Sequence, residues 1–264
     1  MQKPAGILLD VDKTITRSDG TVSLRTIEAI KNVAEAGIKI GLSTGRNYAF
    51  LYKEILKFFP PDSLHVVAGG GQIIRTDGQV IMEKAICYQP LKAIYDLANN
   101  TDTAIITSHK KIVYTNSPKA LENLKQHVWV EKATLLKPQD LKLDFYLLAI
   151  TPLRPPMEEL LHDLQNHNTL RFKDMYDYRN TYYADATAKG VTKAAGAKVW
   201  ARLMNLNLNE IAAVGDGSND IEVVSLVGQG IAMGNAVIEL KNVANLTIEH
   251  TDDNGLAKWL EKFL

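Results

Sequence analysis

The sequence predicts an α/β fold, in which a doubly wound, Rossmann-like parallel sheet carries an inserted α+β domain. Three observations lead to this fold class. Short, unbroken apolar runs such as Gly6 to Leu9 are typical of strands buried on both faces of a parallel sheet. Helix-like segments alternate with such runs near both ends of the chain, whereas hairpin signals replace this alternation in the middle. A chain of 264 residues is also long enough for a domain with an insertion.

The first part of the chain predicts alternating strands and helices. Ser23 can cap a helix that ends at Gly37, which is placed as the residue after the last turn. Pro60 and Pro61 stop the next helix. The elements expected in order are a strand over 6–9, a helix over 23–36, a strand over 38–42, a helix over 47–59 and a strand over 64–68. Right-handed crossovers would make the three strands parallel.

The middle of the chain follows another pattern. Thr76-Asp77-Gly78 is a hairpin turn signal between two short strand-like runs, 72–75 and 79–82. The helices expected beyond this hairpin cover 91–99, 118–127 and 156–166, and the strands cover 103–107, 112–115 and 145–150. Hairpins mixed with helices favour an α+β module.

Alternation resumes near Tyr182. The elements expected there are a helix over 191–204, a strand over 211–214, and a shorter strand, helix and strand over 230–233, 237–243 and 246–248. We therefore predict a core formed by residues 1–82 together with 185–264, and an inserted domain formed by residues 83–184.

The composition argues against several classes of partner. The 30 basic and 30 acidic residues balance, so a general electrostatic footprint for nucleic acid or membrane is absent. No apolar run approaches the roughly 20 residues that span a bilayer, and the N-terminus leads directly into a strand, so we expect neither a membrane span nor a signal peptide. Cys87 is the only cysteine, which excludes an internal disulfide and fits a cytoplasmic protein. The six histidines show no metal-ligand spacing, and we expect them at the surface or at helix caps.

Polar motifs follow three of the predicted strands. Asp10 and Asp12 follow the first strand, Ser43-Thr44-Gly45-Arg46 follows the second, and residues 215–220 follow a late strand. Ligands of open parallel sheets bind beyond the carboxyl ends of the strands, so these motifs are expected at one rim. Asp10 and Asp12 would repel each other there unless a cation or a donor used them.

A metal ion is the partner that these acids suggest. The late motif adds Asp216 and Asp220 to the same rim, which makes four carboxylates in a small volume. Mg²⁺ prefers such oxygen ligands and keeps waters that a phosphate can replace. Gly215 and Gly217 permit the sharp turn between strand and helix that this motif needs.

The order of these motifs resembles the haloacid dehalogenase (HAD) superfamily. Its Asp-x-Asp-x-Thr motif is matched by Asp10 to Thr14, and its Gly-Asp-x-x-Asn-Asp motif by Gly215 to Asp220. Thr44 best matches the Thr or Ser that follows the second strand, and Lys193 best matches the lysine upstream of the last motif, with Lys189 as the fallback and Lys198 on the same predicted helix. The layout of nearly the whole chain resembles the Cof-type phosphatases, whose α/β cap (C2-type) is inserted after the third core strand.

The resemblance implies a mechanism. Asp10 would attack phosphorus and form an aspartyl phosphate, and Asp12 would protonate the leaving oxygen and then deprotonate water. Mg²⁺ would be held by Asp10, the carbonyl of Asp12 and Asp216, with Asp220 bound directly or in the outer shell. The phosphate-binding residues implied are Thr44, Lys193, Asn219 and Arg46. The substrate would be a small phosphorylated metabolite: a sugar phosphate, phosphoglycolate or a cofactor phosphate.

Some questions stay open in the sequence. Position 13 is usually Gly in the resembling subgroup and is Lys13 here. A phosphomutase would use the same intermediate but return the phosphoryl group to the substrate, and a catalytically silent binding or regulatory module would keep the fold without turnover. The leaving group would be recognised by the cap, where the candidate residues are Phe172, Tyr176, Tyr178 and Arg179. The oligomeric state cannot be predicted.

Overall fold

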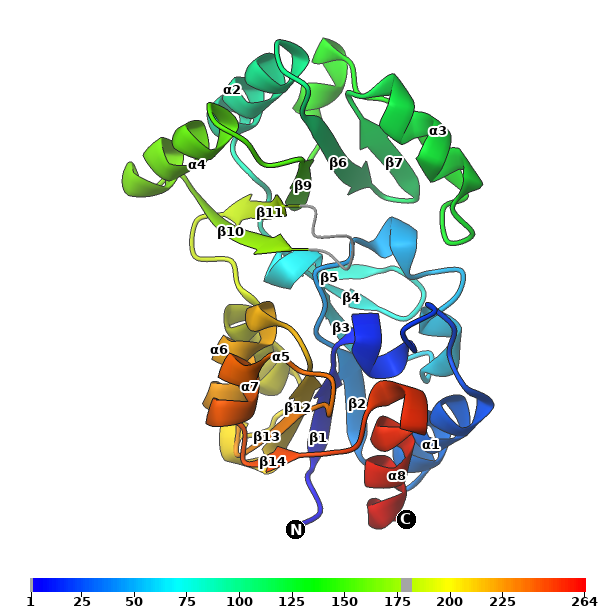
Figure 1. Cartoon of the computed structure of the whole chain (residues 1–264). Coiled ribbons are helices and arrows are strands. Elements are labelled where there is room, and N and C mark those ends of the chain that lie inside the picture. Colours follow the sequence, from blue (N-terminus) through cyan, green and yellow to red (C-terminus); the bar gives the residue numbers. More distant parts are fainter. Residues whose placement is uncertain (1, 177–181) are drawn as a thin grey trace.

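The strands of the computed structural model, which describes residues 2–176 and 182–264, form three sheets (Figure 1). The first is a five-stranded parallel sheet in the order β14-β13-β12-β1-β2. Its strands are β1 (Gly6–Leu9), β2 (Lys39–Leu42), β12 (Ile211–Gly215), β13 (Gln229–Ala232) and β14 (Leu246–Thr247). The parallel sheet predicted from the alternating pattern is therefore confirmed, and β1 lies at its centre, between β12 and β2.

Helices cover both faces of this sheet. The helices are α1 (Leu24–Glu35), α5 (Lys193–Leu203), α6 (Ile221–Leu226), α7 (Ile238–Val243) and α8 (Gly255–Leu260). Figure 1 shows α5, α6 and α7 on one side of the sheet and α1 and α8 on the other. Ser23 caps α1 by accepting a hydrogen bond from the Thr26 amide, and Gly37 follows the helix with a φ of 84°, as its position in the sequence predicts.

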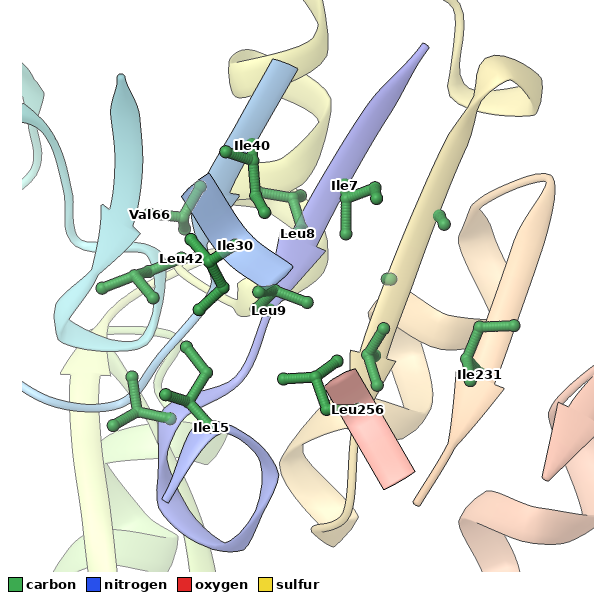
Figure 2. Packing of buried hydrophobic residues seen from close by; sticks show 14 of the residues in the cluster. Ile7, Leu8, Leu9, Ile15, Ile30, Ile40, Leu42, Val66, Ile231 and Leu256 are labelled. Atoms are coloured by element: carbon green, nitrogen blue, oxygen red, sulfur yellow. The ribbon is translucent and has the colours of Figure 1, made fainter. Parts of the chain in front are cut away.

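The core of this unit is built around β1. Ile7, Leu8 and Leu9 are fully buried, so both faces of the strand are covered. Figure 2 shows Ile30 from α1 and Leu256 from α8 in the same apolar cluster as Leu9. Burial on both faces is the reason that the run shows no polar alternation. It also holds the end of β1, where Asp10 follows, in a rigid place.

The second sheet has six strands, and we call it the cap sheet. Its order is β10-β11-β9-β6-β7-β8, and every neighbouring pair is antiparallel except β7 and β8. The strands are β6 (Ala104–His109), β7 (Ile112–Thr115), β8 (Lys132–Leu135), β9 (Leu147–Thr151), β10 (Leu170–Tyr176) and β11 (Tyr182–Ala188). The helices of this part are α2 (Tyr88–Asn99), α3 (Pro118–Gln126) and α4 (Met157–Asn166). The mixture of hairpins and helices confirms the α+β class predicted for the insertion.

The division of the chain into domains is a proposal. The cap sheet has its own buried apolar cluster, separate from the one around β1. We propose a core of residues 1–82 and 185–264 and a cap of residues 83–184. Because β11 runs through the boundary at 184/185, we propose to place the return to the core after Ala188.

Two predictions for the segment after β2 are wrong. Residues 47–59 do not form an α-helix but two short 3₁₀ turns, Tyr48–Phe50 and Leu56–Phe58, joined by irregular turns. Ala49 and Leu51 are both buried, and on a helix of 3.6 residues per turn they would face opposite sides. The third strand, β3 (Leu64–Val67), is not a full member of the parallel sheet: it touches the end of β2 at one parallel bridge, between Ser43 and Val66.

β3 instead forms the third sheet, a small antiparallel one. Its partners are β4 (Gln72–Arg75) and β5 (Val80–Glu83), in the order β3-β4-β5. The hairpin predicted around Thr76-Asp77-Gly78 is thus confirmed as β4 and β5. Its first strand, β4, pairs with β3 on the side away from the bridge to β2. Strands β8, β10 and β11 have no counterpart among the predicted elements. None of the described helices is long and apolar enough to cross a membrane.

The expectation that all histidines lie at the surface or at caps is wrong for His65. Its ring is fully buried in β3, where Nδ1 accepts a hydrogen bond from the Leu42 amide at 3.3 Å and Nε2 lies 3.0 Å from the Thr76 hydroxyl. The ring therefore joins β2, β3 and the hairpin turn as a neutral hydrogen-bonding group.

This ring gives a prediction for the pH dependence of stability. Burial lowers the pKa of His65 from 6.5 to about 3, so the folded protein keeps the ring neutral while the unfolded chain protonates it. The neutral ring contributes fully to the free energy of unfolding above the unfolded pKa of 6.5. As the pH falls from 6.5 toward the folded pKa of about 3, this contribution is lost by about 1.4 kcal/mol per pH unit. Between pH 7 and about pH 5, the free energy of unfolding of wild type should fall by about 2 kcal/mol more than that of His65→Gln. Equal losses in denaturant titrations would contradict the assignment.

Candidate active site

The polar motifs converge at one end of the parallel sheet. Asp10, Ser43 and Asp216 directly follow β1, β2 and β12, three neighbouring strands of one direction. The amide of Asp10 donates to the Val214 carbonyl at 2.9 Å, and the amide of Ser43 donates to the Leu9 carbonyl at 2.8 Å, so the ladder holds the start of each loop. A cavity of about 780 Å³ lies at this rim. Its lining includes Asp10, Asp12, Lys13, Thr44, Gly45, Arg46, Asp216, Asn219 and Asn235, together with Ile106, His127, Leu147, Ala149, Tyr183 and Asp185 from the part of the chain that forms the cap sheet.

Lys193 is the buried cation of the site. Its ammonium donates to Asp10 Oδ1 at 2.6 Å and to Asp220 Oδ1 at 2.7 Å, and the three side chains are 3%, 8% and 2% exposed. The residue opens α5, directly after its cap Thr192, where the helix dipole disfavours a positive charge. A lysine there is explained by its two carboxylates, not by the helix. Lys189 and Lys198 are exposed and make no contact with Asp10 in the described structure.

Charge and burial oppose each other within this cluster. Burial raises the pKa of Asp10 well above its ordinary value; Lys193 opposes this shift, and the charge of Asp220 adds to it. Burial by itself would lower the pKa of Lys193, but the charges of Asp10 and Asp220 outweigh it and raise that pKa. The lysine is therefore always charged, whereas one cation does not balance the carboxylates around it.

This excess negative charge also affects the pKa of Asp216. Burial and the neighbouring Asp220 raise the pKa of Asp216 to about 7. Among the described residues, the one hydrogen bond found to its carboxylate is long, 3.4 Å from Asn235 Nδ2. Oxygen atoms of Asp10, Asp216 and Asp220 lie within 4.8 Å of one another. An all-oxygen donor set with surplus negative charge fits a hard divalent cation of the Mg²⁺ kind.

Asp220 is already occupied by protein donors. Its Oδ2 accepts from the amides of Asp216 and Gly217, at 3.2 and 3.1 Å, while its Oδ1 accepts from Lys193. It closes the turn between β12 and the short helical segment that follows, as the glycines of the motif predict. This arrangement favours an orienting role for Asp220, outside the first shell of a cation, over direct binding.

Asp12 faces the cavity in an ion pair with Arg46. Arg46 Nε donates to one carboxylate oxygen at 2.8 Å and Nη2 to the other at 2.5 Å. Desolvation beside the cavity would raise the pKa of Asp12, but its side chain is 58% exposed, and the hydrogen bond and the charge of Arg46 outweigh desolvation and lower that pKa. The guanidinium also stacks on Trp129, 3.6 Å from the ring centroid. Trp129 precedes β8, so Arg46 joins the acid pair to the part of the chain that forms the cap sheet.

Lys13 has a structural explanation that its sequence position did not provide. Its backbone is left-handed, with φ 54° and ψ 18°, which is the region that glycine adopts most easily. The glycine that is usual at this position in the resembling subgroup is thus explained by the left-handed backbone. In this chain Lys13 adopts that backbone conformation instead. The Lys13 carbonyl accepts from Asn235 Nδ2 at 2.8 Å, and its charge lowers the pKa values of Asp12 and Asp216 after larger effects.

Thr44 and Asn219 both lie at the cavity. Thr44 is 1% exposed, and its Oγ1 accepts from the Arg46 amide at 3.1 Å, which leaves its hydroxyl proton free to donate. Asn219 lines this cavity and a smaller one of about 50 Å³ beside it. The structure thus brings every residue of the predicted site to one rim.

Of the candidate leaving-group residues, Phe172 lines the smaller cavity, together with Asp185 and Asn219. Phe172 is 8% exposed and packs on His162 at 4.8 Å between ring centroids. Tyr178 and Arg179 lie outside the described residues, as does the side chain of Tyr176. Asp185, Asn235 and Tyr183 line the 780 Å³ cavity and were missed. A lone Asp in the apolar run that became β11 was the one available signal for Asp185.

Comparisons with known proteins agree with this geometry. A family model described as haloacid dehalogenase-like hydrolase matches residues 7–260. The "Stress response protein YhaX" of Bacillus subtilis is 27% identical, over 97% of this chain and 92% of that protein. The "5-amino-6-(5-phospho-D-ribitylamino)uracil phosphatase YcsE" of the same organism is 22% identical, over 96% and 92%. The solved structure of the HAD phosphatase BT1666 from Bacteroides thetaiotaomicron superposes with a TM-score of 0.79 at 29% identity and covers 98% of this chain and 94% of its own.

Proposed function

Because the chain belongs to the haloacid dehalogenase-like hydrolases, we propose that it is a Mg²⁺-dependent phosphatase that hydrolyses small phosphorylated metabolites through an aspartyl phosphate on Asp10. The observation that carries this proposal is the buried contact of Asp10 with Lys193 at 2.6 Å, next to Asp216 and Asp220. Two of the similar proteins are named as phosphatases, which supports the same reaction class.

The chemistry proposed for the chain's own residues proceeds in two steps. Asp10 Oδ bonds to phosphorus while the bond from phosphorus to the leaving oxygen breaks, and Asp12 gives that oxygen a proton. Asp12 then takes a proton from water, whose oxygen bonds to phosphorus and releases Asp10 and inorganic phosphate. Because the Arg46 pair lowers the pKa of Asp12, Asp12 must first leave that pair and take up a proton from solvent, which it then gives to the leaving oxygen. Arg46 can then donate to the phosphoryl oxygens.

Three side chains would hold the transferring group. The Lys193 ammonium lies 2.6 Å from the nucleophile, so an incoming phosphoryl oxygen can share its third proton. The Thr44 hydroxyl donates from the opposite loop, and Asn219 orients the turn. Mg²⁺, held by Asp10, the Asp12 carbonyl and Asp216, would neutralise the repulsion between the nucleophile and the phosphoryl group. Asp220 keeps Lys193 and the turn in place.

The test of this function is a screen of the purified full chain. Phosphorylated metabolites of several classes and p-nitrophenyl phosphate would each be assayed for phosphate with Mg²⁺ and with a chelator. We expect phosphate release that depends on Mg²⁺. The absence of release across the panel would favour the silent binding module, and transfer of the phosphoryl group to a second position of the substrate, without free phosphate, would favour the phosphomutase.

Replacement of Asp216 with Ala tests the proposed metal site. Loss of one carboxylate ligand should raise the Mg²⁺ concentration that gives half-maximal activity by at least about 10- to 100-fold, the range that replacement of an outer-shell partner of a metal ligand already gives. Asp253→Ala removes an exposed acid outside the cluster and serves as the matched control. Mg²⁺ titrations that coincide for wild type and Asp216→Ala would exclude Asp216 as a ligand.

A further inference from the structure

Asp185 reaches the rim of the active site from the cap sheet. It lies in β11, where its register partners are Ala149 on β9 and Lys173 on β10. A methyl group added to Gly45 would lie 3.4 Å from Asp185 Oδ2. Gly45 follows Thr44 in the loop that we propose to hold the phosphoryl group, so the carboxylate stands directly over that loop.

The alternation of β11 turns this acid toward the parallel sheet. Ala184 and Ala186 are fully buried in the apolar cluster of the cap sheet. Asp185 and Tyr183, on the opposite face, line the 780 Å³ cavity. Strands present alternate residues to opposite faces, so this acid is set by the strand register and not by a loop.

Among the described residues, no ion pair to Asp185 is found. Arg171 is paired with Glu222, and Lys173 donates to the Ser218 carbonyl at 2.6 Å, so both cations of β10 are bound to the loop and helix that follow β12. No hydrogen bond to the Asp185 carboxylate is found among the described residues. Burial raises its pKa to about 7, which Lys193 opposes and Asp12 reinforces.

The other described residues by which the cap-sheet side lines the 780 Å³ cavity are not acids, lysines or arginines. Ile106, Leu147 and Ala149 from the cap sheet line the cavity with apolar side chains. His127 also lines it, and burial and the charge of Arg46 lower the pKa of its ring. Among the described lining residues on the cap-sheet side, Asp185 is thus the one charged group, and it is an acid.

Resting on the phosphatase activity proposed above, we propose that Asp185 determines substrate class: it selects leaving groups that are neutral polyols and rejects leaving groups that carry a carboxylate. A hydroxyl can donate to the ionised carboxylate, and the partly buried acid gains a partner that the described protein does not provide. A carboxylate at the same place would meet a like charge in a partly desolvated site. Sugar phosphates and ribityl phosphates fit this rule, whereas phosphoglycolate does not.

The test compares substrates that differ only in this group. Glycerol 3-phosphate and 3-phosphoglycerate form a three-carbon pair, and sorbitol 6-phosphate and 6-phosphogluconate form a six-carbon pair. At about pH 8, above the pKa of about 7, wild type should favour the polyol in kcat/KM by at least about 10-fold in one pair or both. Asp185→Asn, which keeps the shape and removes the charge, should reduce that preference by about 10-fold or more.

The control variant and the wild-type activity distinguish a failure of this inference from a failure of the proposed function. Asp102→Asn removes an exposed acid that precedes β6 and should leave the preference at the wild-type value. The inference would be overturned if Asp185→Asn kept the wild-type preference for polyols, or if wild type favoured the carboxylates. Neither result would contradict the proposed phosphatase activity. If wild type releases no Mg²⁺-dependent phosphate from these substrates or from p-nitrophenyl phosphate, the proposed function itself fails.

Discussion

Replacement of Asp10 with Asn is expected to lower the rate of phosphate release by at least about 10⁴-fold, because the amide cannot act as the nucleophile. The amide keeps the shape of the side chain, and its oxygen can still accept from Lys193. The fold should therefore survive, as circular dichroism and the thermal midpoint would report. Phosphate release from a metabolite with and without the change measures the effect.

Residual activity of Asp10→Asn would contradict the role of Asp10 as the nucleophile. If Asp10→Asn kept a tenth or more of the wild-type rate in a folded protein, water and not Asp10 would be the attacking group. Asp19→Asn is a suitable control, because Asp19 is an exposed acid that follows the same motif and lies outside the 780 Å³ cavity.

Replacement of Lys193 with Met should affect activity and stability together. Asp10 and Asp220 would lose their shared cation while buried, and breaking a buried pair on one side costs on the order of 3–5 kcal/mol. Loss of the donor to the transferring group should also lower kcat by about 10²- to 10³-fold. Denaturant unfolding and steady-state kinetics measure the two effects.

Lys198→Met is the matched control for this change. Lys198 lies on the same helix but is exposed, so its replacement should alter neither the rate nor the free energy of unfolding by much. Mg²⁺ should recover part of the stability that Lys193→Met loses, since a cation again balances the carboxylates. Equal effects of the two replacements would show that the buried ion pairs contribute nothing special.

The parts of the fold that could be predicted from sequence are those set by local patterns. The run Gly6 to Leu9 shows burial on both faces, Ser23 and Gly37 mark the ends of one helix, and Thr76-Asp77-Gly78 marks a hairpin. In each case the signal lies within a few residues of the structure that it determines. The acidic motifs were found for the same reason, because each directly follows a strand.

The parts that could not be predicted depend on contacts between distant segments. The buried residues Leu51, Ile55 and Phe59 of the segment 47–59 have helical spacing, but Ala49, off that face, is buried as well, so packing and not local spacing decides the path of this segment. β3 has the composition of a core strand but pairs with the first strand of the hairpin that follows it. The stacking of Arg46 on Trp129 joins residues 83 positions apart, and no local pattern announces it.

The site shows the same division. The sequence offered three lysines near the start of one helix, and only the packing of α5 against the rim places Lys193, alone of the three, beside Asp10. Asp185 is a single acid in an apolar strand, which sequence alone cannot distinguish from an edge residue. Its position over Gly45 depends on how the cap sheet lies on the parallel sheet.

In the proposed mechanism, Asp10 carries the phosphoryl group between two steps that Asp12 assists. Asp12→Asn offers the most direct measurement with p-nitrophenyl phosphate, whose leaving group needs no proton. The first step should then proceed and the second should stall, because no base activates the water. We predict a burst of about one p-nitrophenol per active site with Mg²⁺, and an acyl phosphate that borohydride reduces to homoserine at position 10. No burst and no modified residue at position 10, in a folded protein whose wild type releases phosphate, would contradict the account.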